Sequence, residues 1–301
     1  MRKLAKVPAA VFGLGMLALC LPAMEREVTI SVYQGRCADG DFDANLATAR
    51  QAVQDALARH SDFLVLPETF LSGYDTREHM RQGARKLDDP QVRAFIAESA
   101  AHDMVVLVGM ARIAGEGIYN SELVIHKGNL LGTYSKMMLT EGDRDQLGFV
   151  PGREMPVFTA HGVRFAVIIC HDSSFPHPAL MARMKGAEIL FSPHYNNIAA
   201  ERVDAHRRWV RNCHIGLAVQ MKMVVARSNV VGTSKGLGYG DSFIVSPRGE
   251  MLAEAELFRT EMITAKVSPA LFRSPYVWAD LNEVPASVKA SLADLLTGAA
   301  K

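Results

Sequence analysis

The chain has 301 residues, of which 49% are hydrophobic and 22% charged, and its 33 basic and 32 acidic side chains leave a formal net charge of +1. These values are typical of a globular protein with a sizeable core. Because no long block of one charge occurs, composition gives no electrostatic case for binding nucleic acid or an anionic membrane. A small-molecule substrate is the better expectation.

The first 23 residues have a basic start, an apolar run and a closing Pro22-Ala23. This is the layout of a secretory signal peptide cleaved near Ala23, and such a protein would be exported. The alternative is a start codon set too early, because Met24 is followed by EREVTISVYQ, which opens a domain cleanly on a strand. We favour this second interpretation and therefore expect a cytoplasmic protein.

Strands and helices alternate after this segment. Buried strands are predicted by branched apolar runs at 28–34, 62–68, 104–113, 163–170, 187–193 and 221–232. Hairpins around a turn with Gly are predicted at 122–136 and 241–256. Apolar residues at helical spacing, together with Pro and Gly at the ends, predict helices at 45–60, 90–102, 176–186 and 204–220.

Hairpins mixed with strand–helix–strand units indicate an α/β fold with a mixed sheet covered by helices. No linker rich in Gly, Ser or Pro divides the chain, so we predict one domain over residues 24–269. Residues 270–301 are predicted to form a C-terminal arm with a short helix. Such arms often pack on a second subunit, so we expect a homodimer or a larger homo-oligomer.

The four cysteines, Cys20, Cys37, Cys170 and Cys213, are widely spaced and form no C-x-x-C pair. Neither a disulfide scaffold nor a structural zinc site is therefore indicated. The spacings of the ten histidines fit no common metal motif. We expect no metal ion and no organic cofactor.

Three residues that could act as a base, a cation and a nucleophile follow predicted buried strands. Glu68 comes after FLVLP, Lys136 after LLGTYS, and Cys170 after FAVII. A thiol reacts as its thiolate, so it needs a base and a cation, which a carboxylate and an ammonium group would supply. Taken singly, the glutamate suits a turn cap, the lysine a solvated strand end, and the cysteine a core position. Spacing alone leaves both interpretations open.

Larger segments of the chain narrow this choice. Several segments resemble, in chain order, the successive signatures of the nitrilase superfamily of carbon–nitrogen hydrolases. They are LVLPETFLSGY, IYNSELVIHKGNLLGTYSKMML, GFVPG, FAVIICHDSSFPHPALMARMKGAEILFSPH, and ARSNVVG with GDSFIVSPRGE. The resemblance runs from about residue 28 to 267. It implies a four-layer αββα sandwich, and stacking of two such sandwiches in a dimer.

The resemblance also implies roles for individual residues. Glu68 matches the general base, Lys136 the lysine that stabilises the oxyanion, and Cys170 the nucleophile. The family often places a second glutamate after the lysine, and Glu141 is the nearest candidate, with Asp143 and Asp145 behind it. The oxyanion would be held by Lys136 and by the backbone N–H of residue 171.

Two segments depart from the family pattern. His171-Asp172 follows the cysteine where many amidases carry Tyr-Asp and true nitrilases carry Trp-Glu; the acid favours the amidase side. His171 could contribute hydrogen bonding in the site or titrate near neutral pH, and a structural histidine with satisfied hydrogen bonds is the alternative. Residues 217–221 read LAVQM where members show Arg-Ala-x-Glu-Asn.

Pocket residues are expected at the same strand ends. Tyr74, together with His194, Tyr195, Asn196 and Asn197, is predicted to face Cys170, with Tyr195 or Asn196 contacting substrate; the alternative is a merely polar loop. We expect an amidohydrolase acting on a linear amide or N-carbamoyl compound and releasing ammonia. A nitrile hydrolase is the alternative, and a catalytically silent binding protein or an acyltransferase are further ones.

Overall fold

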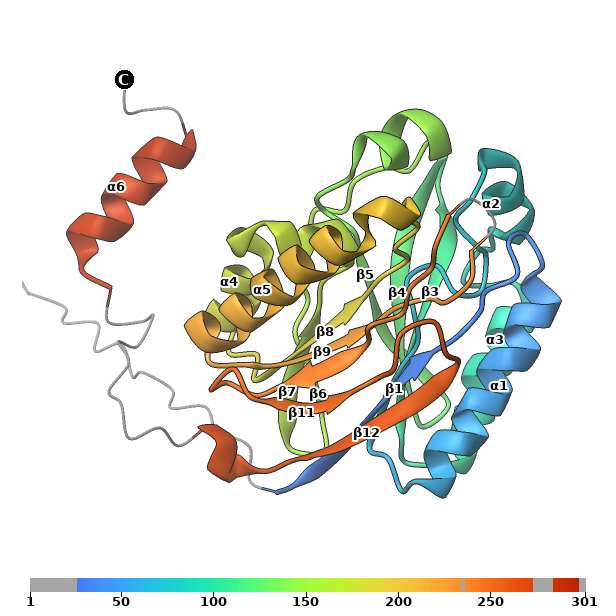
Figure 1. Ribbon diagram of the computed structural model, residues 1–301, viewed down its shortest axis with the longest axis horizontal. Helices are drawn as coiled ribbons and strands as arrows, with labels where there is room; N and C mark the ends of the chain where they lie inside the picture. Colours follow the sequence, from blue (N-terminus) through green and yellow to red (C-terminus); the bar gives the residue numbers. More distant parts are fainter. Residues whose placement is uncertain (1–25, 234–235, 273–283, 298–301) are drawn as a thin grey trace, which may run out of the picture.

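A computed structural model of the protein describes residues 26–233, 236–272 and 284–297. It contains two six-stranded sheets with helices on their outer faces (Figure 1). The predicted signal segment at 1–23 and most of the predicted arm between 270 and 283 lie outside the described residues. Within the described residues, no helix is both long and apolar enough to cross a bilayer.

The first sheet has the strand order β12-β1-β2-β3-β4-β5. Its central strands β1, β2 and β3 are parallel, and antiparallel strands complete both edges. The predicted hairpin at 122–136 is confirmed as β4 and β5. The strand bounds are β1 (Val28–Gln34), β2 (Phe63–Val65), β3 (Val105–Ala114), β4 (Gly117–His126), β5 (Asn129–Ser135) and β12 (Glu261–Val267).

The second sheet repeats this plan with the order β11-β10-β9-β8-β7-β6. Here β7, β8 and β9 are the parallel centre. The strand bounds are β6 (Phe158–Ala160), β7 (Val163–Val167), β8 (Ile189–Pro193), β9 (Val224–Ser228), β10 (Phe243–Val245) and β11 (Met251–Glu254). The carboxyl ends of the parallel strands are where polar side chains of a site are expected to gather.

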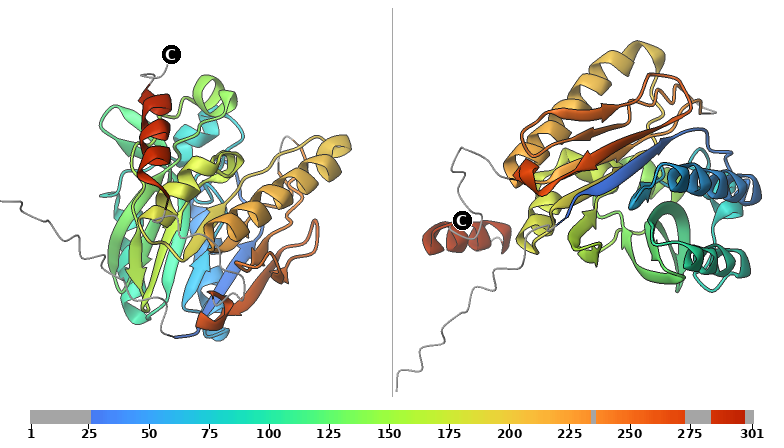
Figure 2. Two further views of the ribbon diagram at one scale, coloured as in Figure 1. Left: turned by 90° about the vertical axis from the view of Figure 1, so that its left-hand side faces the viewer. Right: turned by 90° about the horizontal axis from the view of Figure 1, so that it is seen from below.

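Helices cover the outer face of each sheet. α1 and α3 lie on the first sheet, and α4 and α5 lie on the second; in the right-hand view of Figure 2, α1 (blue) and α5 (gold) are on opposite sides of the strands. The predicted αββα sandwich is therefore confirmed. The helix bounds are α1 (Phe42–Ala58), α2 (Arg77–Gly83), α3 (Pro90–Glu98), α4 (Pro176–Met184), α5 (Val203–Met221) and α6 (Ala286–Thr297).

The main apolar core lies between the two sheets. Phe63 packs against Phe165 and Phe191 at ring-centroid distances of 5.2 and 5.6 Å, and all three side chains are fully buried. Each buried aromatic or branched side chain of this kind stabilises the fold by about 1.5–3 kcal/mol relative to exposure. This core fixes the sheets face to face, and so fixes the strand ends that carry the site.

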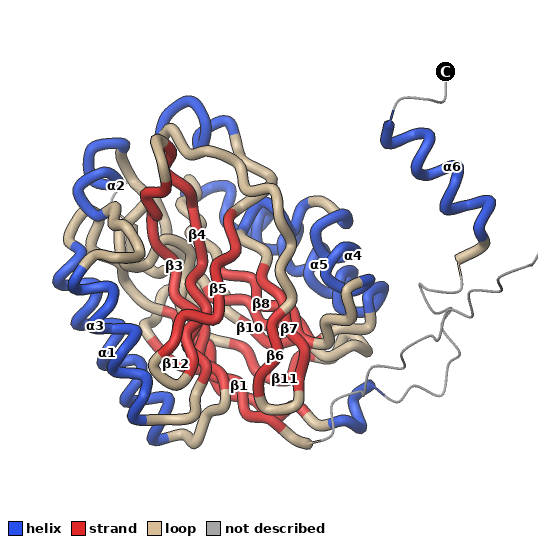
Figure 3. The backbone as a smooth tube through the Cα atoms, turned by 180° about the vertical axis from the view of Figure 1, so that it is seen from behind, coloured by secondary structure: helices blue, strands red, loops and turns tan. Residues whose placement is uncertain are grey.

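A second apolar cluster joins α1 and α3 to the first sheet. Leu46, Ala49 and Val53, which the helical spacing places on one face of α1, are buried against outward-facing residues of β2 and β3 such as Leu64 and Val106. Asp41 caps α1 by accepting a hydrogen bond from the Ala44 N–H at 3.0 Å. Figure 3 shows the resulting arrangement, with strands inside and helices outside; α6 lies apart from the sandwich.

Some elements were not predicted. β6 has only three residues. β12 has an alternating pattern with too few apolar residues to predict a buried strand. β12 is fixed by pairing along the whole of β1, from Val28 opposite Val267 to Gln34 opposite Glu261. That pairing joins opposite ends of the sequence, so local pattern gives little sign of it.

Candidate active site

Glu68 lies just beyond the end of β2 and is fully buried. Its Oε1 accepts hydrogen bonds from Lys136 Nζ at 2.8 Å and from Asn120 Nδ2 at 2.7 Å, and its Oε2 accepts one from the Tyr195 backbone N–H at 2.8 Å. Burial raises the pKa of Glu68, although the Lys136 cation opposes this shift. A buried carboxylate held from both sheets is well placed to act as a base.

The turn after β2 holds this carboxylate in place. Thr69 has a left-handed backbone with φ of +47°, which bends the chain directly after Glu68. The turn rests against Gly109 of β3, where an added Cβ would lie 2.4 Å from the Thr69 nitrogen. Any larger residue at position 109 would push the turn, and the Glu68 carboxylate with it, out of position.

Lys136 follows the last residue of β5 and contacts two carboxylates. Its Nζ lies 2.8 Å from Glu68 Oε1 and 2.9 Å from Asp143 Oδ2, and all three side chains are shielded from solvent. Burial alone would lower the pKa of Lys136, but the surrounding acidic groups, Glu68 foremost, raise it well above its usual value. Lys136 is therefore a fixed cation inside the sandwich.

The acid beside the lysine is Asp143, which corrects the expectation of Glu141. The chain turns through a short helix, η2 (Gly142–Leu147), that points residue 143 inward and leaves residue 141 exposed. Asp143 accepts hydrogen bonds from the Tyr74 hydroxyl at 2.5 Å and from the Thr140 N–H at 2.8 Å. Burial would raise the pKa of Asp143, but Lys136 and these donors lower it overall.

Cys170 is the first residue of a short helix, η3 (Cys170–Ser174), after β7. Its φ of +45° is left-handed, a conformation that costs about 1–2 kcal/mol for a residue other than Gly. Burial raises the pKa of the thiol, as do the charge of Glu68 and a hydrogen bond to it. The resting group is therefore a thiol, and the Glu68 carboxylate lies beside it.

Asp172 ties the cysteine loop to the lysine loop. Its Oδ2 accepts hydrogen bonds from the Ile169 N–H at 2.8 Å and the Tyr134 hydroxyl at 2.7 Å, and its Oδ1 accepts one from the Met138 N–H at 2.7 Å. Burial nevertheless raises the pKa of Asp172 to about 6. One carboxyl thus fixes the position of Cys170 relative to Lys136.

This carboxyl predicts a pH dependence of stability. A folded-state pKa of about 6 exceeds the value of about 3.9 in an unfolded chain, so its stabilising contribution is greatest below about pH 4 and is lost as the pH rises to about 6. We expect the wild type to lose about 3 kcal/mol of unfolding free energy from this source. Urea unfolding from pH 4 to 7 checks this, because Asp172→Asn removes that slope whereas exposed Asp88→Asn retains it. Parallel curves for wild type and Asp172→Asn would contradict it.

In the structure, the other predicted residues line one pocket. This pocket has a volume of about 230 Å³ and is lined by Cys170 as well. Asn196 Nδ2 lies 3.6 Å from Cys170 Sγ, whereas the Tyr195 hydroxyl donates away from the pocket to Asp39 at 2.8 Å. The lining residues are Tyr74, Thr140, Cys170, His171, Ser173, Ser174, His194, Tyr195, Asn196, Asn197, Ile198, His206, Trp209 and Val210.

His171 lines the same pocket as a neutral imidazole. Burial and the Lys136 cation lower its pKa, so it is uncharged at neutral pH. Its ring meets Phe175 edge-on at 5.2 Å, and its Nδ1 lies 3.3 Å from the Ser174 hydroxyl. The side chain is held by Ser174 and Phe175, and it lines the pocket together with Cys170.

Supporting residues were missed by sequence reasoning. Asn120 orients Glu68, and Arg227 donates to Asn196 Oδ1 at 2.6 Å and to the Gly240 carbonyl at 3.1 Å. Arg227 is fully buried. A charged residue inside the apolar run MVVARS was the available signal, because buried arginines are rare unless paired. Residues 217–221, which depart from the family pattern, put Leu217, Ala218 and Met221 into the core.

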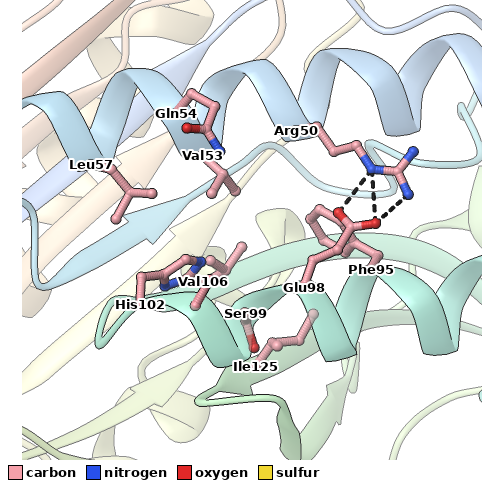
Figure 4. A pocket seen from close by; sticks show the side chains of 11 residues that line it. Arg50, Val53, Gln54, Leu57, Phe95, Glu98, Ser99, His102, Val106 and Ile125 are labelled. Carbon is pink, nitrogen blue, oxygen red and sulfur yellow. Dashed lines mark hydrogen bonds and ion pairs between the residues drawn. The ribbon is translucent and has the colours of Figure 1, made fainter.

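Two other features lie away from Cys170. A pocket of about 310 Å³ between α1 and α3 has an apolar floor and the Arg50–Glu98 ion pair at one end (Figure 4), and its lining includes no cysteine. Asp103, His126 and His161 form the single three-residue group within the described ranges that could offer a metal ion ligand atoms within 4.8 Å of one another. Asp103 is already paired with His126 and Lys127.

Known proteins are similar to this chain in sequence and in fold. A nitrilase of Pyrococcus abyssi is 29% identical over 80% of this chain and 90% of its own, and an N-carbamoylputrescine amidase of Arabidopsis thaliana is 31% identical over 77% and 83%. The crystal structure of Saccharomyces cerevisiae Nit3, a member of the nitrilase superfamily, aligns with a TM-score of 0.72 at 22% identity over 83% and 93%.

The family model gives the same assignment over a longer range. The model for carbon-nitrogen hydrolases matches residues 29–274, which include both sheets except for the first residue of β1, together with the Glu68, Lys136 and Cys170 cluster. With relatives that include amidases and a nitrilase, the chain is an enzyme of the amidase-like branch of the nitrilase superfamily. The protein belongs to the carbon–nitrogen hydrolase family.

Proposed function

We propose that this enzyme hydrolyses the C–N bond of a small linear amide or N-carbamoyl compound through a thioester on Cys170, releasing ammonia. The observation that carries this proposal is the Glu68 carboxylate, which is hydrogen-bonded to Lys136 and adjacent to the Cys170 thiol, and Cys170 in turn lines a small pocket. Base, cation and nucleophile come from three strand ends and meet in one buried place.

The reaction balances within this cluster. Glu68 takes the thiol proton as sulfur attacks the carbonyl carbon, and Lys136 with the His171 backbone N–H stabilises the oxyanion. The C–N bond breaks as the protonated Glu68 gives its proton to the leaving nitrogen. A water molecule then loses a proton to Glu68 and attacks the thioester. The acid leaves, and the proton returns to sulfur.

The pocket supports a small substrate. Its volume of about 230 Å³ is below the range of about 300–1,000 Å³ found for drug-sized ligands. Tyr74 and Tyr195 form one wall, with ring centroids 5.3 Å apart, while His171 and Asn196 supply polar edges. A short acyl or carbamoyl group suits this space, and so does a nitrile of the same length.

Ammonia release tests the proposal. The purified wild type is assayed with linear amides, N-carbamoyl amino acids, ureides and nitriles. We expect turnover with one or more of these classes and none with Cys170→Ala. Cys213→Ala is the matched control, because Cys213 is a free, partly buried cysteine of α5 that does not line the pocket. Equal activity in wild type and Cys170→Ala would reject the thioester route.

The trapped intermediate gives an independent readout. Mass spectrometry of the wild type quenched during turnover should show the acyl group of the substrate on the peptide that contains Cys170. The same adduct on Cys213, or the absence of any adduct when ammonia accumulates in a burst, would contradict the assignment of the nucleophile.

A further inference from the structure

A cluster of three buried side chains lies behind the pocket and has no part in the reaction just described. Ser192 Oγ lies 3.1 Å from His194 Nε2 and 3.0 Å from His214 Nε2, and the two Nε2 atoms are 3.2 Å apart. His194 is 2% exposed and His214 is fully buried. Ser192 and His194 belong to β8 and the loop after it, whereas His214 belongs to α5.

The hydrogen bonds of the cluster fix which nitrogens carry protons. Burial and the Arg227 cation lower the pKa of both histidines, that of His214 to about 3, so both rings are neutral. His214 Nδ1 lies 2.8 Å from the Val210 carbonyl oxygen, and it must donate because a carbonyl only accepts. His214 Nε2 is therefore an acceptor with a lone pair.

The position of the hydrogen on His214 determines where the hydrogen lies on His194. His194 Nε2 faces the lone pair of His214 Nε2, and two lone pairs at 3.2 Å would repel, so His194 Nε2 carries a hydrogen. A neutral imidazole has one N–H, so His194 Nδ1 carries a lone pair. Among the described residues this Nδ1 has no hydrogen-bond partner, although it is buried.

An unpartnered buried acceptor calls for a donor from outside the protein. His194 lines the pocket that contains Cys170, and the next residues in the chain, Tyr195 and Asn196, contact Glu68 and the Cys170 sulfur. A molecule that occupies this pocket is thus the group best placed to donate to the His194 nitrogen.

We propose that His194 Nδ1 accepts a hydrogen bond from an N–H of the bound substrate, and that this contact makes the pocket select amides and ureido compounds over nitriles. An amide nitrogen carries the hydrogen that this acceptor needs, whereas a nitrile nitrogen offers only a lone pair. The inference rests on the proposed function, because it assigns a specificity-determining residue to the same site.

Two substitutions separate the two nitrogens of the ring. His194→Gln places an amide N–H near the former Nε2 and so retains the donor to the cluster, but it removes the acceptor at Nδ1. His194→Asn does the reverse, because its carbonyl oxygen lies near the former Nδ1. The pair therefore distinguishes contact with substrate from support of the Ser192–His214 cluster.

Binding is measured with butyramide and butyronitrile, which have the same carbon skeleton, in a Cys170→Ala background that prevents turnover. The ratio of the nitrile Kd to the amide Kd should fall about tenfold with His194→Gln and be retained with His194→Asn. With Cys170 present, His194→Gln should raise KM for the amide more than it lowers kcat. An unchanged ratio in His194→Gln, or an equal loss in both variants, would overturn the proposal.

A measurement on the unsubstituted histidine covers the case in which a variant does not fold. The 15N resonance of His194 Nδ1 in the Cys170→Ala protein should move toward hydrogen-bonded values on addition of butyramide and stay unchanged with butyronitrile. Equal responses to both compounds reject the contact. A different result would contradict the proposed function, namely turnover that is retained in Cys170→Ala.

Discussion

Replacing Lys136 by Met should reduce kcat by about 10²–10³-fold and destabilise the fold by about 3–5 kcal/mol. The first effect follows from the loss of the cation proposed to hold the oxyanion. The second follows because Glu68 and Asp143, at 2.8 and 2.9 Å from the ammonium group, would remain buried without a counter-charge. Ammonia-release kinetics and urea unfolding measure the two effects separately.

Surface lysine Lys127 is the matched control for this substitution. It pairs with Asp103 at 2.9 Å, but both side chains are about 60% exposed, so Lys127→Met should change stability by less than about 1 kcal/mol and leave kcat unchanged. The penalty in Lys136→Met should also shrink at low pH, where the two carboxylates become protonated. A Lys136→Met protein with wild-type kcat would remove the lysine from the reaction.

Replacing Glu68 by Gln should reduce the rate of Cys170 acylation by about 10²–10⁴-fold, since the thiol would lose its base. The amide retains the size of the carboxyl, but its single oxygen can accept either the Tyr195 N–H or the Lys136 and Asn120 donors, and not both sets. Urea unfolding therefore shows how much of the variant is folded, and single-turnover acylation of the folded protein reports the chemical step. Deacylation should slow as well, because the same group activates water.

Glu122 of β4 is the control for Glu68. Its carboxyl is fully buried, neither oxygen has a partner among the described residues, and burial together with the Glu68 charge raises its pKa well above the usual value. It is therefore a neutral acid already, and Glu122→Gln should leave turnover close to that of the wild type. A loss in Glu122→Gln as large as that in Glu68→Gln would mean that the assay reports damage to the sheet and not loss of the base.

Much of the sandwich could be predicted because its central strands are continuous runs of apolar residues in the sequence. The apolar run at 28–34 coincides with β1, and the apolar positions of α1 are buried as its spacing indicates. Glu68, Lys136 and Cys170 became candidates because each follows such a strand, and the resemblance to the nitrilase superfamily then implied their roles. Strand ends converge in this class of fold, so a local pattern carried information about a distant contact.

The remaining parts of the site depend on loop geometry. The sequence offers Glu141 as the nearest acid after Lys136, with Asp143 and Asp145 behind it, and only the turn of η2 decides which of them reaches the lysine. The acceptor on His194 depends on His214, twenty residues later, and on the Val210 carbonyl. Such contacts are set by packing of α5 on the second sheet, which residue patterns do not encode individually.

The left-handed backbone of Cys170 bears on how far this protein can be made more robust. The left-handed φ of +45° at position 170 costs stability, so the proposed nucleophile is also a weak point of the scaffold. Programmes that rank substitutions by stability alone would favour glycine there and would select against activity. Thermostable derivatives of this enzyme are better sought on the surface of the helical layers, away from the turns after β2 and β7.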